Sequence, residues 1–445
     1  MSKIRLFGTS SGYVEIAPAA AAGNNTLTAP STVGEIIAKD AAGAIGVTSV
    51  HTTNIVATGT TKDGAAVTIT ESGIEASGIG ITCANINGGQ IGGRRNMVIN
   101  GSMQVAQRGT SSVNQGYSTV DRFKTENDGV DEGPTRAQVD VSSGTSPYTE
   151  GFRKAFKITN GNNTNGAGAS DYHEIIYKTE AQDLANSGWK YTSSSSYITL
   201  SFWVKASVAQ NYYFRFQTKD GTSYNYPMET GSLTADTWTK ITKTIPGASN
   251  LQIDNDNGEG PKIAWSLFKG TNFTASSVTL NQWAAYADGT QTPDQTTTWY
   301  TTNDATFEIT GVQLEVGPQA TAFEHRSFGE ELALCQRYFQ KYICSAQEWI
   351  YVEGAGVQYK WWQSHFNSMR ATPTVGVSGL STGSGTNAAG LSGEISSIAV
   401  TSTSGGDANG RVSYRVTFSA ESGTARQIHH TDSWSGDSVT YSAEL

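Results

Sequence analysis

The feature that most constrains this chain is a stretch of 103 residues, 14–116, that contains no Phe, Tyr or Trp. Its large apolar residues are mostly Val and Ile, set among Gly, Ala, Ser and Thr. Aromatic and Leu side chains supply much of the burial energy of a compact core. We therefore do not expect this stretch to fold as an independent globular domain. All ten Trp lie in the 329 residues that follow, where compact domains are expected.

The aromatic-free stretch contains a short repeat of isoleucines spaced five residues apart, punctuated by glycines. Its members are Ile69, Ile74, Ile79, then Ile81, Ile86 and Ile91. Short apolar strands with frequent Gly turns are typical of an extended β-structure that completes its core with neighbouring chains. We predict that residues 1–95 attach to a larger assembly and form a trimeric β shaft. A flexible linker is the alternative.

Strict alternation of apolar and polar residues marks the region that follows, residues 96–327. In residues 197–205, the side chains of Ile198, Leu200, Phe202 and Val204 fall on one face and Trp203 on the other. Residues 212–217 alternate in the same way, with Tyr212, Phe214 and Phe216 opposite Tyr213, Arg215 and Gln217. Many short alternating strands separated by turn clusters predict a jelly-roll β-sandwich.

One helix is predicted after the sandwich, as a connector over residues 328–342. Ser327 and Glu330 form a capping box at its start. A heptad pattern follows, made by Phe328, Leu332, Cys335, Phe339 and Tyr342. Such a pattern is typical of a seam between chains, here a homotrimer seam, although the stripe could instead pack on its own sandwich. Residues 343–445 are predicted to form a distal β-sandwich, so the fold class is all-β.

Composition excludes several functions. A net charge of −9 and a pI of 5.3 disfavour nucleic acid as a partner. No run of 18 apolar residues is available for membrane insertion. Three cysteines, Cys83, Cys335 and Cys344, form no metal or disulfide framework and are expected to be free thiols in a protein assembled in a cytoplasm.

Catalytic and metal motifs are weak, and we predict that the chain is not an enzyme. Two GxSxG strings, at residues 8–12 and 379–383, lack the strand-then-helix context of a nucleophile elbow. No cofactor is expected. The acidic turn at residues 254–260 resembles a calcium loop, with Asp254, Asp256 and Glu259 as weak ligand candidates, but Gly258 stands where an oxygen ligand is needed. The pair His429 and His430 is a second weak metal candidate.

Several stretches resemble the tail-fibre and receptor-binding proteins of tailed bacteriophages, of the marine or cyanobacterial type. They are NMVINGSMQVAQRG from Asn96, YSTVDRF from Tyr117, EAQDL from Glu180, LSFWVKAS from Leu200, ITGVQLEVG from Ile309, AFEHRSFGEELALCQRYF from Ala322, MRATPTV from Met369 and the chain end SAEL from Ser442. The N-terminal GTSSGYVEI and NNTLTAP are similar to the N-termini of such fibres. The resemblance implies a carbohydrate-binding-like jelly roll, a homotrimer, a virion location and a role in host attachment. It supplies no fixed binding residues.

The function we expect is non-covalent recognition of a host-surface glycan by a phage tail fibre, docked through its N-terminus on a tail or baseplate protein. A purely structural fibre or adaptor is the alternative, and a glycan depolymerase is the third. Sugar rings stack on exposed aromatic planes beside hydrogen-bonding groups. Two surfaces offer such groups, unless neighbouring sheets or subunits cover them: Trp203, Tyr213, Arg215 and Gln217 in the jelly roll, and Trp349, Tyr351, Tyr359, Trp361 and Trp362 distally. The distal set is favoured as the receptor site, because a receptor meets the tip first.

Overall fold

The structure, a computed structural model, describes residues 95–343, 368–371, 373–378 and 438–445, and elsewhere only short strands. The chain divides into two units, residues 1–81 and 82–445. In the first unit, β1 (Ile4–Phe7) and β2 (Tyr13–Ile16) form an antiparallel hairpin. The isoleucine repeat of the predicted shaft lies outside the described residues. Among the described residues, no helix has the length and hydrophobicity needed to cross a bilayer.

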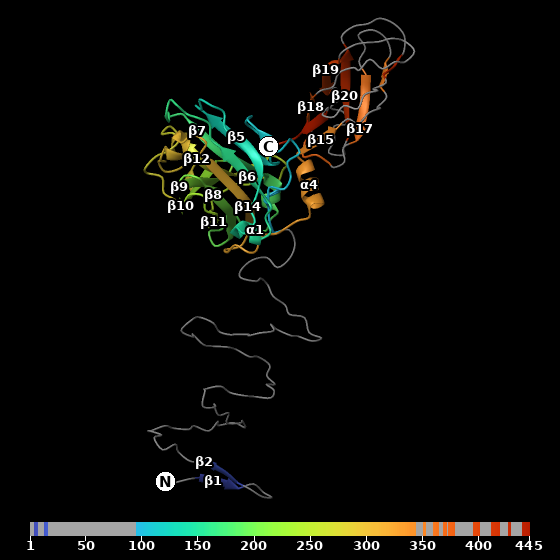
Figure 1. The fold of residues 1–445 in the computed structure, drawn as a ribbon. Helices are drawn as coiled ribbons and strands as arrows, with labels where there is room; N and C mark the ends of the chain where they lie inside the picture. The colour runs from blue at the N-terminus through green and yellow to red at the C-terminus, as the bar shows by residue number, and fades with distance from the viewer. Residues whose placement is uncertain are drawn as a thin grey trace. The chain divides into compact units, whose positions relative to one another are not determined.

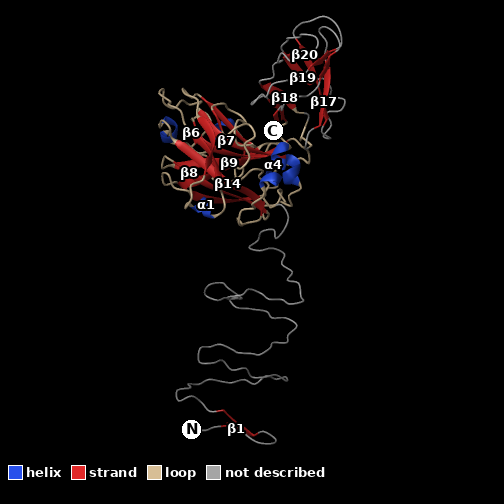
Figure 2. Cartoon of the chain, turned by 45° about the vertical axis from the view of Figure 1, so that its right-hand side comes forward, coloured by secondary structure: helices blue, strands red, loops and turns tan. Residues whose placement is uncertain are grey.

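Two antiparallel sheets of six strands each form the centre of the second unit (Figures 1 and 2). The first, named here the β9 sheet, has in spatial order β13 (Ala284–Ala285), β10 (Tyr224–Ser232), β9 (Asn211–Gln217), β12 (Glu259–Lys269), β7 (Tyr172–Glu180) and β4 (Phe123–Asp128). The second, the β8 sheet, has β11 (Thr239–Pro246), β8 (Tyr197–Ala206), β14 (Thr306–Val316), β6 (Lys154–Thr159), β5 (Thr135–Asp140) and β3 (Ser111–Ser112).

The core of this sandwich is the set of inward-facing side chains that the alternation predicted. All seven predicted core residues of β8 and β9 are buried in one cluster. The rings of Phe202 and Phe214 meet edge to face at 5.1 Å between the two sheets, and Trp265 packs on Phe202 at 5.6 Å. The prediction of an all-β fold with a sandwich is confirmed.

Short helices fill the connections between strands. They are α1 (Ser146–Thr149), α2 (Ala181–Ala185), the 3-10 helix η1 (Asp288–Thr290) and α3 (Thr298–Thr301). The longest described helix, α4 (Phe328–Gln336), lies beside the sandwich (Figure 2). Its Ser327 side chain accepts a hydrogen bond from the Glu330 backbone N–H at 3.3 Å, so the predicted N-terminal cap is present.

The predicted helix end is wrong, and the heptad residues do not all lie on one helix. The helix ends at Gln336, and Phe339 and Tyr342 belong to strand β15 (Phe339–Ile343). Cys335 is a buried free thiol that packs on Ile99 of the same chain, whereas Phe328 is exposed. Pairing of β15 with the last strand of the chain overrides the helical pattern, because tertiary contacts decide the state of short segments.

The remaining strands belong to three small sheets. In the first, β22 (Ser438–Ser442) lies between β15 and β18 (Thr374–Ser378). The second pairs β16 (Ile350–Val352) with β21 (Arg426–Ile428), and the third places β20 (Arg411–Phe418) between β17 (Tyr359–Ser364) and β19 (Ile395–Val400). Since β15 and β22 are neighbours, the chain leaves the sandwich and returns to it at the same place.

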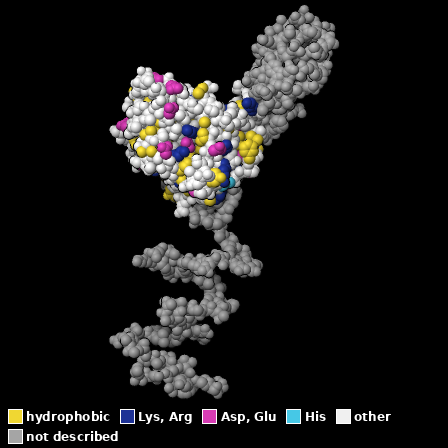
Figure 3. Space-filling model, in the orientation of Figure 1, with side chains coloured by type: hydrophobic (Ala, Val, Ile, Leu, Met, Phe, Trp, Pro, Cys, Tyr) yellow, Lys and Arg dark blue, Asp and Glu magenta, His cyan; other side chains and the backbone are white. Residues whose placement is uncertain are grey.

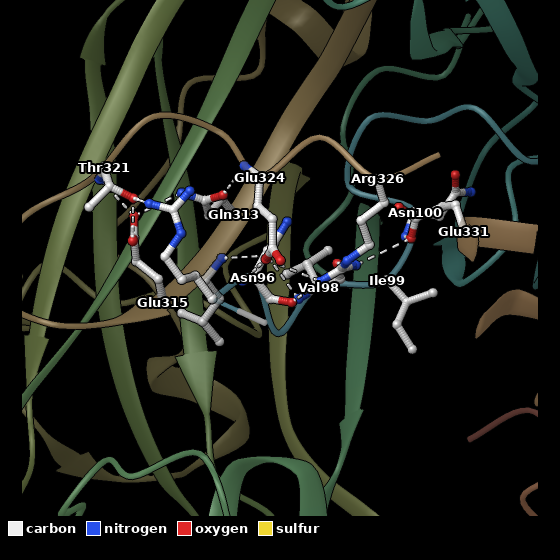
Figure 4. Close-up of polar contacts among 12 residues, drawn as sticks. Asn96, Val98, Ile99, Asn100, Gln313, Glu315, Thr321, Glu324, Arg326 and Glu331 are labelled. Carbon is white, nitrogen blue, oxygen red and sulfur yellow. Dashed lines mark hydrogen bonds and ion pairs between the residues drawn. The ribbon is translucent and has the colours of Figure 1, made fainter. Parts of the chain in front are cut away.

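A buried network fixes the first residues of the sandwich (Figure 4). The Asn96 side chain accepts a hydrogen bond from the Leu314 backbone at 3.1 Å and donates one to Val312 O at 3.1 Å, both on β14. Arg326 donates to the backbone oxygens of Asn96 and Val98. Gly101 approaches β14 so closely that a Cβ would lie 2.1 Å from Val312 O. The Asn100 N–H donates to the Glu331 carboxylate of α4 at 2.5 Å, so the chain is held between β14 and α4 where the sandwich begins.

A second buried cluster, named here the terminal clamp, holds the other end of the chain. It consists of Arg108, Asp121, Arg122 and Glu444. The Glu444 carboxylate pairs with Arg122 at 2.5 Å and with Arg108 at 3.0 Å. The Arg122 guanidinium also lies 3.4 Å from the centre of the Tyr338 ring. Burial raises the pKa of Asp121 to about 6, although the Arg108 charge opposes that rise.

Our first prediction concerns this clamp. Glu444→Gln removes a buried carboxylate, leaves Arg122 without its ion-pair partner and leaves Arg108 with Asp121 alone. We expect the free energy of unfolding to fall by about 3–5 kcal/mol, the usual effect of breaking a buried pair, as measured by urea denaturation. The matched control is Asp140→Asn, which breaks the exposed pair with Lys154 and should cost less than about 1 kcal/mol. Equal decreases in the free energy of unfolding for the two variants would contradict the stabilising role of the terminal clamp.

Our second prediction concerns pH. His173 is fully buried beside Trp299, and neither ring nitrogen has a hydrogen-bond partner. Burial, then the Arg136 charge, lowers its pKa to about 3. Between pH 6.5 and 3 the His173 imidazole is protonated in the unfolded chain and neutral in the folded protein. The free energy of unfolding therefore decreases as the pH falls through this range. From pH 7.5 to 5 the loss is about 2 kcal/mol.

The test compares variants, because Asp121, whose pKa is raised to about 6, titrates in the same window with the opposite sign. We expect His173→Leu to lose about 2 kcal/mol less stability than the parent between pH 7.5 and 5. His325→Gln, a change at an exposed histidine, is the control and should follow the parent. Identical pH profiles for all three proteins would refute the role of His173.

Candidate functional site

The structure separates the predicted jelly-roll site into two parts. Tyr213, Arg215 and Gln217 lie together on the outer face of β9, because the alternate residues of that strand are in the core. Trp203 lies on the outer face of β8, which belongs to the other sheet. The core stands between these two faces. The prediction of one surface containing Trp203 and Tyr213 is therefore wrong.

Trp203 is covered by its own chain. Its side chain is 8% exposed and packs with Phe152, Tyr148 and Phe323. The indole Nε1 donates a hydrogen bond to the Glu150 carboxylate at 3.1 Å. A sugar ring cannot stack on this indole without displacing these groups, so Trp203 is a structural residue of the sandwich.

The outer face of the β9 sheet carries a buried charge cluster across three strands. The Arg215 guanidinium of β9 forms a two-pronged ion pair with Glu174 of β7, reaching over β12. Lys269 Nζ lies 3.1 Å from the same carboxylate, and Ser266 Oγ donates to it at 2.9 Å. Burial opposes ionisation of Glu174, but Arg215 and Lys269 outweigh it and hold the pKa of that carboxyl below its usual value.

Unsatisfied hydrogen-bonding atoms gather beside this cluster. Gln217 and Asn225 are directly opposite each other on β9 and β10. Gln217 Oε1, Asn225 Oδ1 and Arg215 Nε are all buried without a hydrogen-bond partner, as is Gln291 Oε1. Asn225 donates through its amide to Gln291 O at 2.8 Å, which places the two residues together. Buried polar atoms without partners are rare in folded proteins and call for an explanation.

Four half-buried aromatic rings surround the cluster. Tyr213 and Tyr172 stand on β9 and β7, and Phe273 meets Tyr172 edge to face at 5.5 Å. Lys269 Nζ lies 5.1 Å from the Tyr172 ring and 4.9 Å from the Phe273 ring. Tyr286 is held by its backbone N–H, which donates to Ser223 O, and burial and the Asp288 hydrogen bond raise its pKa. Rings, donors and acceptors thus lie in one region.

Lys262 completes this face. It lies on β12 directly between Gln217 of β9 and Lys178 of β7. Lys178 pairs with Glu259 at 2.6 Å, but Lys262, which is half-buried, has no carboxylate partner among the described residues. Burial, followed by the Arg215 charge, lowers the pKa of Lys262 to about 8.

Sequence reasoning found the β9 residues of this site and missed those of the adjacent strands. Lys262 and Lys269 are seven residues apart on β12, so strict alternation would place them on opposite faces. The β-bulge between Ser266 and Phe268 brings both to the outer face, and the sequence did not indicate it. No pattern in the sequence indicated that β7 and β12 lie beside β9. Cross-strand neighbours come from topology, which alternation does not encode.

The other candidates have different outcomes. In the acidic turn, Asp256 accepts a hydrogen bond from the Gly258 N–H at 2.9 Å, and Glu259 pairs with Lys178. Asp254 is exposed. Within the described part of the chain, no group of three or more His, Cys, Asp or Glu side chains could hold a metal ion. His429 and His430 lie outside the described residues, as do both GxSxG strings.

The distal aromatic set is described only through its strands. Tyr351 belongs to β16, and Tyr359, Trp361 and Trp362 belong to β17, where Trp361 pairs with Tyr414 of β20. Trp349 lies outside the described residues. The distal surface therefore stays a prediction.

Comparison with known proteins gives only distant similarity. No protein-family model matches the chain, and no curated protein matches it. Similar solved structures include a putative sugar binding protein from Bacteroides thetaiotaomicron, with 11% identity over 50% of this chain and 99% of that chain and a TM-score of 0.26.

Two further similar structures have comparable scores. The family 11 carbohydrate-binding module from Clostridium thermocellum, in complex with a β-1,3-1,4-mixed-linked tetrasaccharide, has 14% identity over 48% of this chain and 98% of that chain, with a TM-score of 0.22. The enzymatically active domain of tailspike protein 4 of bacteriophage CBA120 has 10% identity over 50% of this chain and 21% of that chain, with a TM-score of 0.26. The chain thus spans about a fifth of that tailspike structure. Likeness at this level assigns neither a family nor a function.

Our third prediction concerns Lys262. With a pKa of about 8, its amine should react with acetic anhydride at pH 8 much faster than an ordinary lysine, whose pKa is about 10.4. Competitive trace labelling followed by peptide mass spectrometry, with N-acetyl-lysine amide as the internal reference, measures this apparent pKa. A titration that coincides with the reference would contradict the buried, unpaired setting of Lys262.

Proposed function

We propose that this chain binds a glycan non-covalently through the outer face of the β9 sheet. The observation that carries the proposal is the presence of four half-buried rings and the half-buried amine of Lys262 on one face; the rings are those of Tyr172, Tyr213, Phe273 and Tyr286. The unpartnered atoms of Arg215, Gln217, Asn225 and Gln291 are buried beneath these groups. Sugar hydroxyls both donate and accept hydrogen bonds, and the C–H faces of a sugar ring stack on aromatic planes. A saccharide meets both requirements at once, whereas a purely apolar ligand meets only one.

The binding is proposed to be non-catalytic. Hydrolysis of a glycosidic bond needs a pair of carboxyl groups about 5–9.5 Å apart, one of them able to give up a proton. Glu174, the buried carboxyl at the centre of this face, has its pKa lowered and both oxygens engaged by Arg215 and Lys269. This carboxylate is a structural anchor for two cations and a poor proton donor.

We further propose that the protein is a homotrimeric phage tail fibre that attaches the virion to its host. The aromatic-free segment of residues 14–116 and the resemblance of the stretches beginning at Asn96 and Ala322 support this role. Residues 1–95 would dock on a tail or baseplate protein and form the shaft. The sandwich would then present its glycan site to the host surface.

Our fourth prediction tests the glycan site. The full chain is applied to a panel of bacterial capsular and O-antigen polysaccharides, and affinity for each bound member is measured by biolayer interferometry. The double variant Tyr213→Ala, Tyr286→Ala removes two rings worth about 1 kcal/mol each, so we expect affinity to fall at least about tenfold. Tyr148→Ala, on the opposite face of the sandwich, is the matched control and should bind like the parent.

Three readouts of the same samples separate the alternatives. Shortening of a bound polysaccharide would contradict the non-catalytic role. If the double variant binds the polysaccharide as tightly as the parent does, the site lies elsewhere. The surface to test next is then that of the distal strands β16 and β17. No binding to any member would favour a purely structural fibre. Light scattering on the parent tests the trimer, for which three times the chain mass of 47.2 kDa is expected.

A further inference from the structure

The charges at the centre of the candidate site do not balance. Arg215, Lys262 and Lys269 bring three positive charges to one carboxylate, that of Glu174. Other charged groups of this face are engaged: Lys124 pairs with Glu126 at 2.5 Å and Lys178 with Glu259 at 2.6 Å. Asp128 accepts a hydrogen bond from the Gly129 N–H, and Asp288 accepts one from the Tyr286 hydroxyl at 2.7 Å.

Two carboxylates lie toward the edge, beyond Tyr213. Glu229 accepts a hydrogen bond from the Asn211 amide, and Asp294 accepts one from the Thr274 hydroxyl. Around Glu174 itself, therefore, cations outnumber carboxylates, and Lys262 is the cation without an ion-pair contact.

Lys262 is the cation that a ligand can reach. Arg215 and Lys269 are 2% and 4% exposed, whereas Lys262 is half-buried and stands between Gln217 and Lys178 in the register. A charged amine that is partly withdrawn from water without a carboxylate in ion-pair contact is destabilised. Glu174 and Glu259 act on the Lys262 amine, but burial and the Arg215 charge outweigh them. An anion placed beside it removes that penalty. The buried cations behind it add an attraction that salt screens less than it screens surface charges.

We propose that the glycan bound at this face is anionic and carries a carboxylate, sulfate or phosphate group that pairs with Lys262. This inference rests on the proposed glycan site and adds the chemical class of its ligand. The whole chain has a net charge of −9, so an acidic polysaccharide gains no general attraction to the protein. Its affinity comes from the local excess of positive charge between β9 and β7.

The lowered pKa of Lys262 is consistent with this pairing. Burial and the nearby Arg215 charge bring that pKa to about 8 in the free protein, and a bound anion would raise it again. A neutral sugar hydroxyl can accept one hydrogen bond from the amine but supplies no counter-charge. The site therefore distinguishes an acidic sugar from its neutral analogue through a single ionic contact.

Our fifth prediction tests this charge recognition. Each carboxylate-bearing polysaccharide of the panel is presented beside its carbodiimide-reduced neutral derivative, and sulfated and phosphorylated members beside their desulfated or dephosphorylated forms. We expect the full chain to bind an acidic member at least about tenfold more tightly than its neutral partner, with binding weakened at 0.5 M NaCl. Lys262→Gln should abolish the preference, and Lys262→Arg should keep it. Lys190→Gln, at an exposed lysine elsewhere, is the control.

The outcomes separate this inference from the proposed function. Equal binding to a polysaccharide and its neutral derivative, or binding to neutral members only, would overturn the charge recognition and leave glycan binding intact. A preference that Lys262→Gln retains would overturn the assignment to this face. No binding to any member, acidic or neutral, would overturn both proposals. The preferred partner of each pair shows whether carboxylate, sulfate or phosphate is recognised.

Discussion

The rest of the second unit depends on the buried ion pairs that join the two ends of its chain. Glu444, next to the last residue, pairs with Arg122 and Arg108 near the start of the sandwich. Arg337, just after α4, binds Glu180 through two hydrogen bonds of 2.7 Å. These contacts fix α4 and the paired strands β15 and β22 against the sandwich. The segment between β15 and β22 is thus held at both ends, as a long insertion between two anchored strands.

Strand β9 shows how one short sequence serves the core and the site together. Its inward residues Tyr212, Phe214 and Phe216 form part of the core, which fixes the strand rigidly. The outward Arg215 is then held over β12 by Glu174, with its Nε free of protein partners. A site built on sheet strands keeps its geometry better than one on loops. Mixed acidic and basic groups also occupy the sandwich face turned to the viewer in Figure 3, so charge alone does not mark the site.

The alternation of apolar and polar residues predicted which side chains of a strand face the core. The alternation in residues 197–205 and 212–217 placed seven core residues correctly, because side chains on a strand change face at every step. The same rule could not tell that β8 and β9, although consecutive in the chain, belong to different sheets. This is why Trp203 and Tyr213 were assigned to one surface. The prediction of one helix from Phe328 to Tyr342 failed for a related reason, since pairing of β15 with β22 is a contact between residues about 100 apart.

The motifs that resemble phage fibres contribute mainly to the region where the start of the sandwich, α4 and the end of the chain meet, named here the junction. They contribute little to the candidate site. Asn96, Arg108, Arg122, Glu180, Arg326, Arg337, Arg370 and Glu444 all belong to quoted stretches. Each makes contacts at the start of the sandwich, at α4 or at the chain end. The site, by contrast, is built by β7, β9, β10 and β12 and the segment before β14. Residues such as Lys262 and Gln217 make no junction contact, so substitutions there can change the ligand while the architecture stays the same. Resemblance in the junction motifs therefore informs on architecture, whereas the ligand of the candidate site depends on the residues of the sheet face itself.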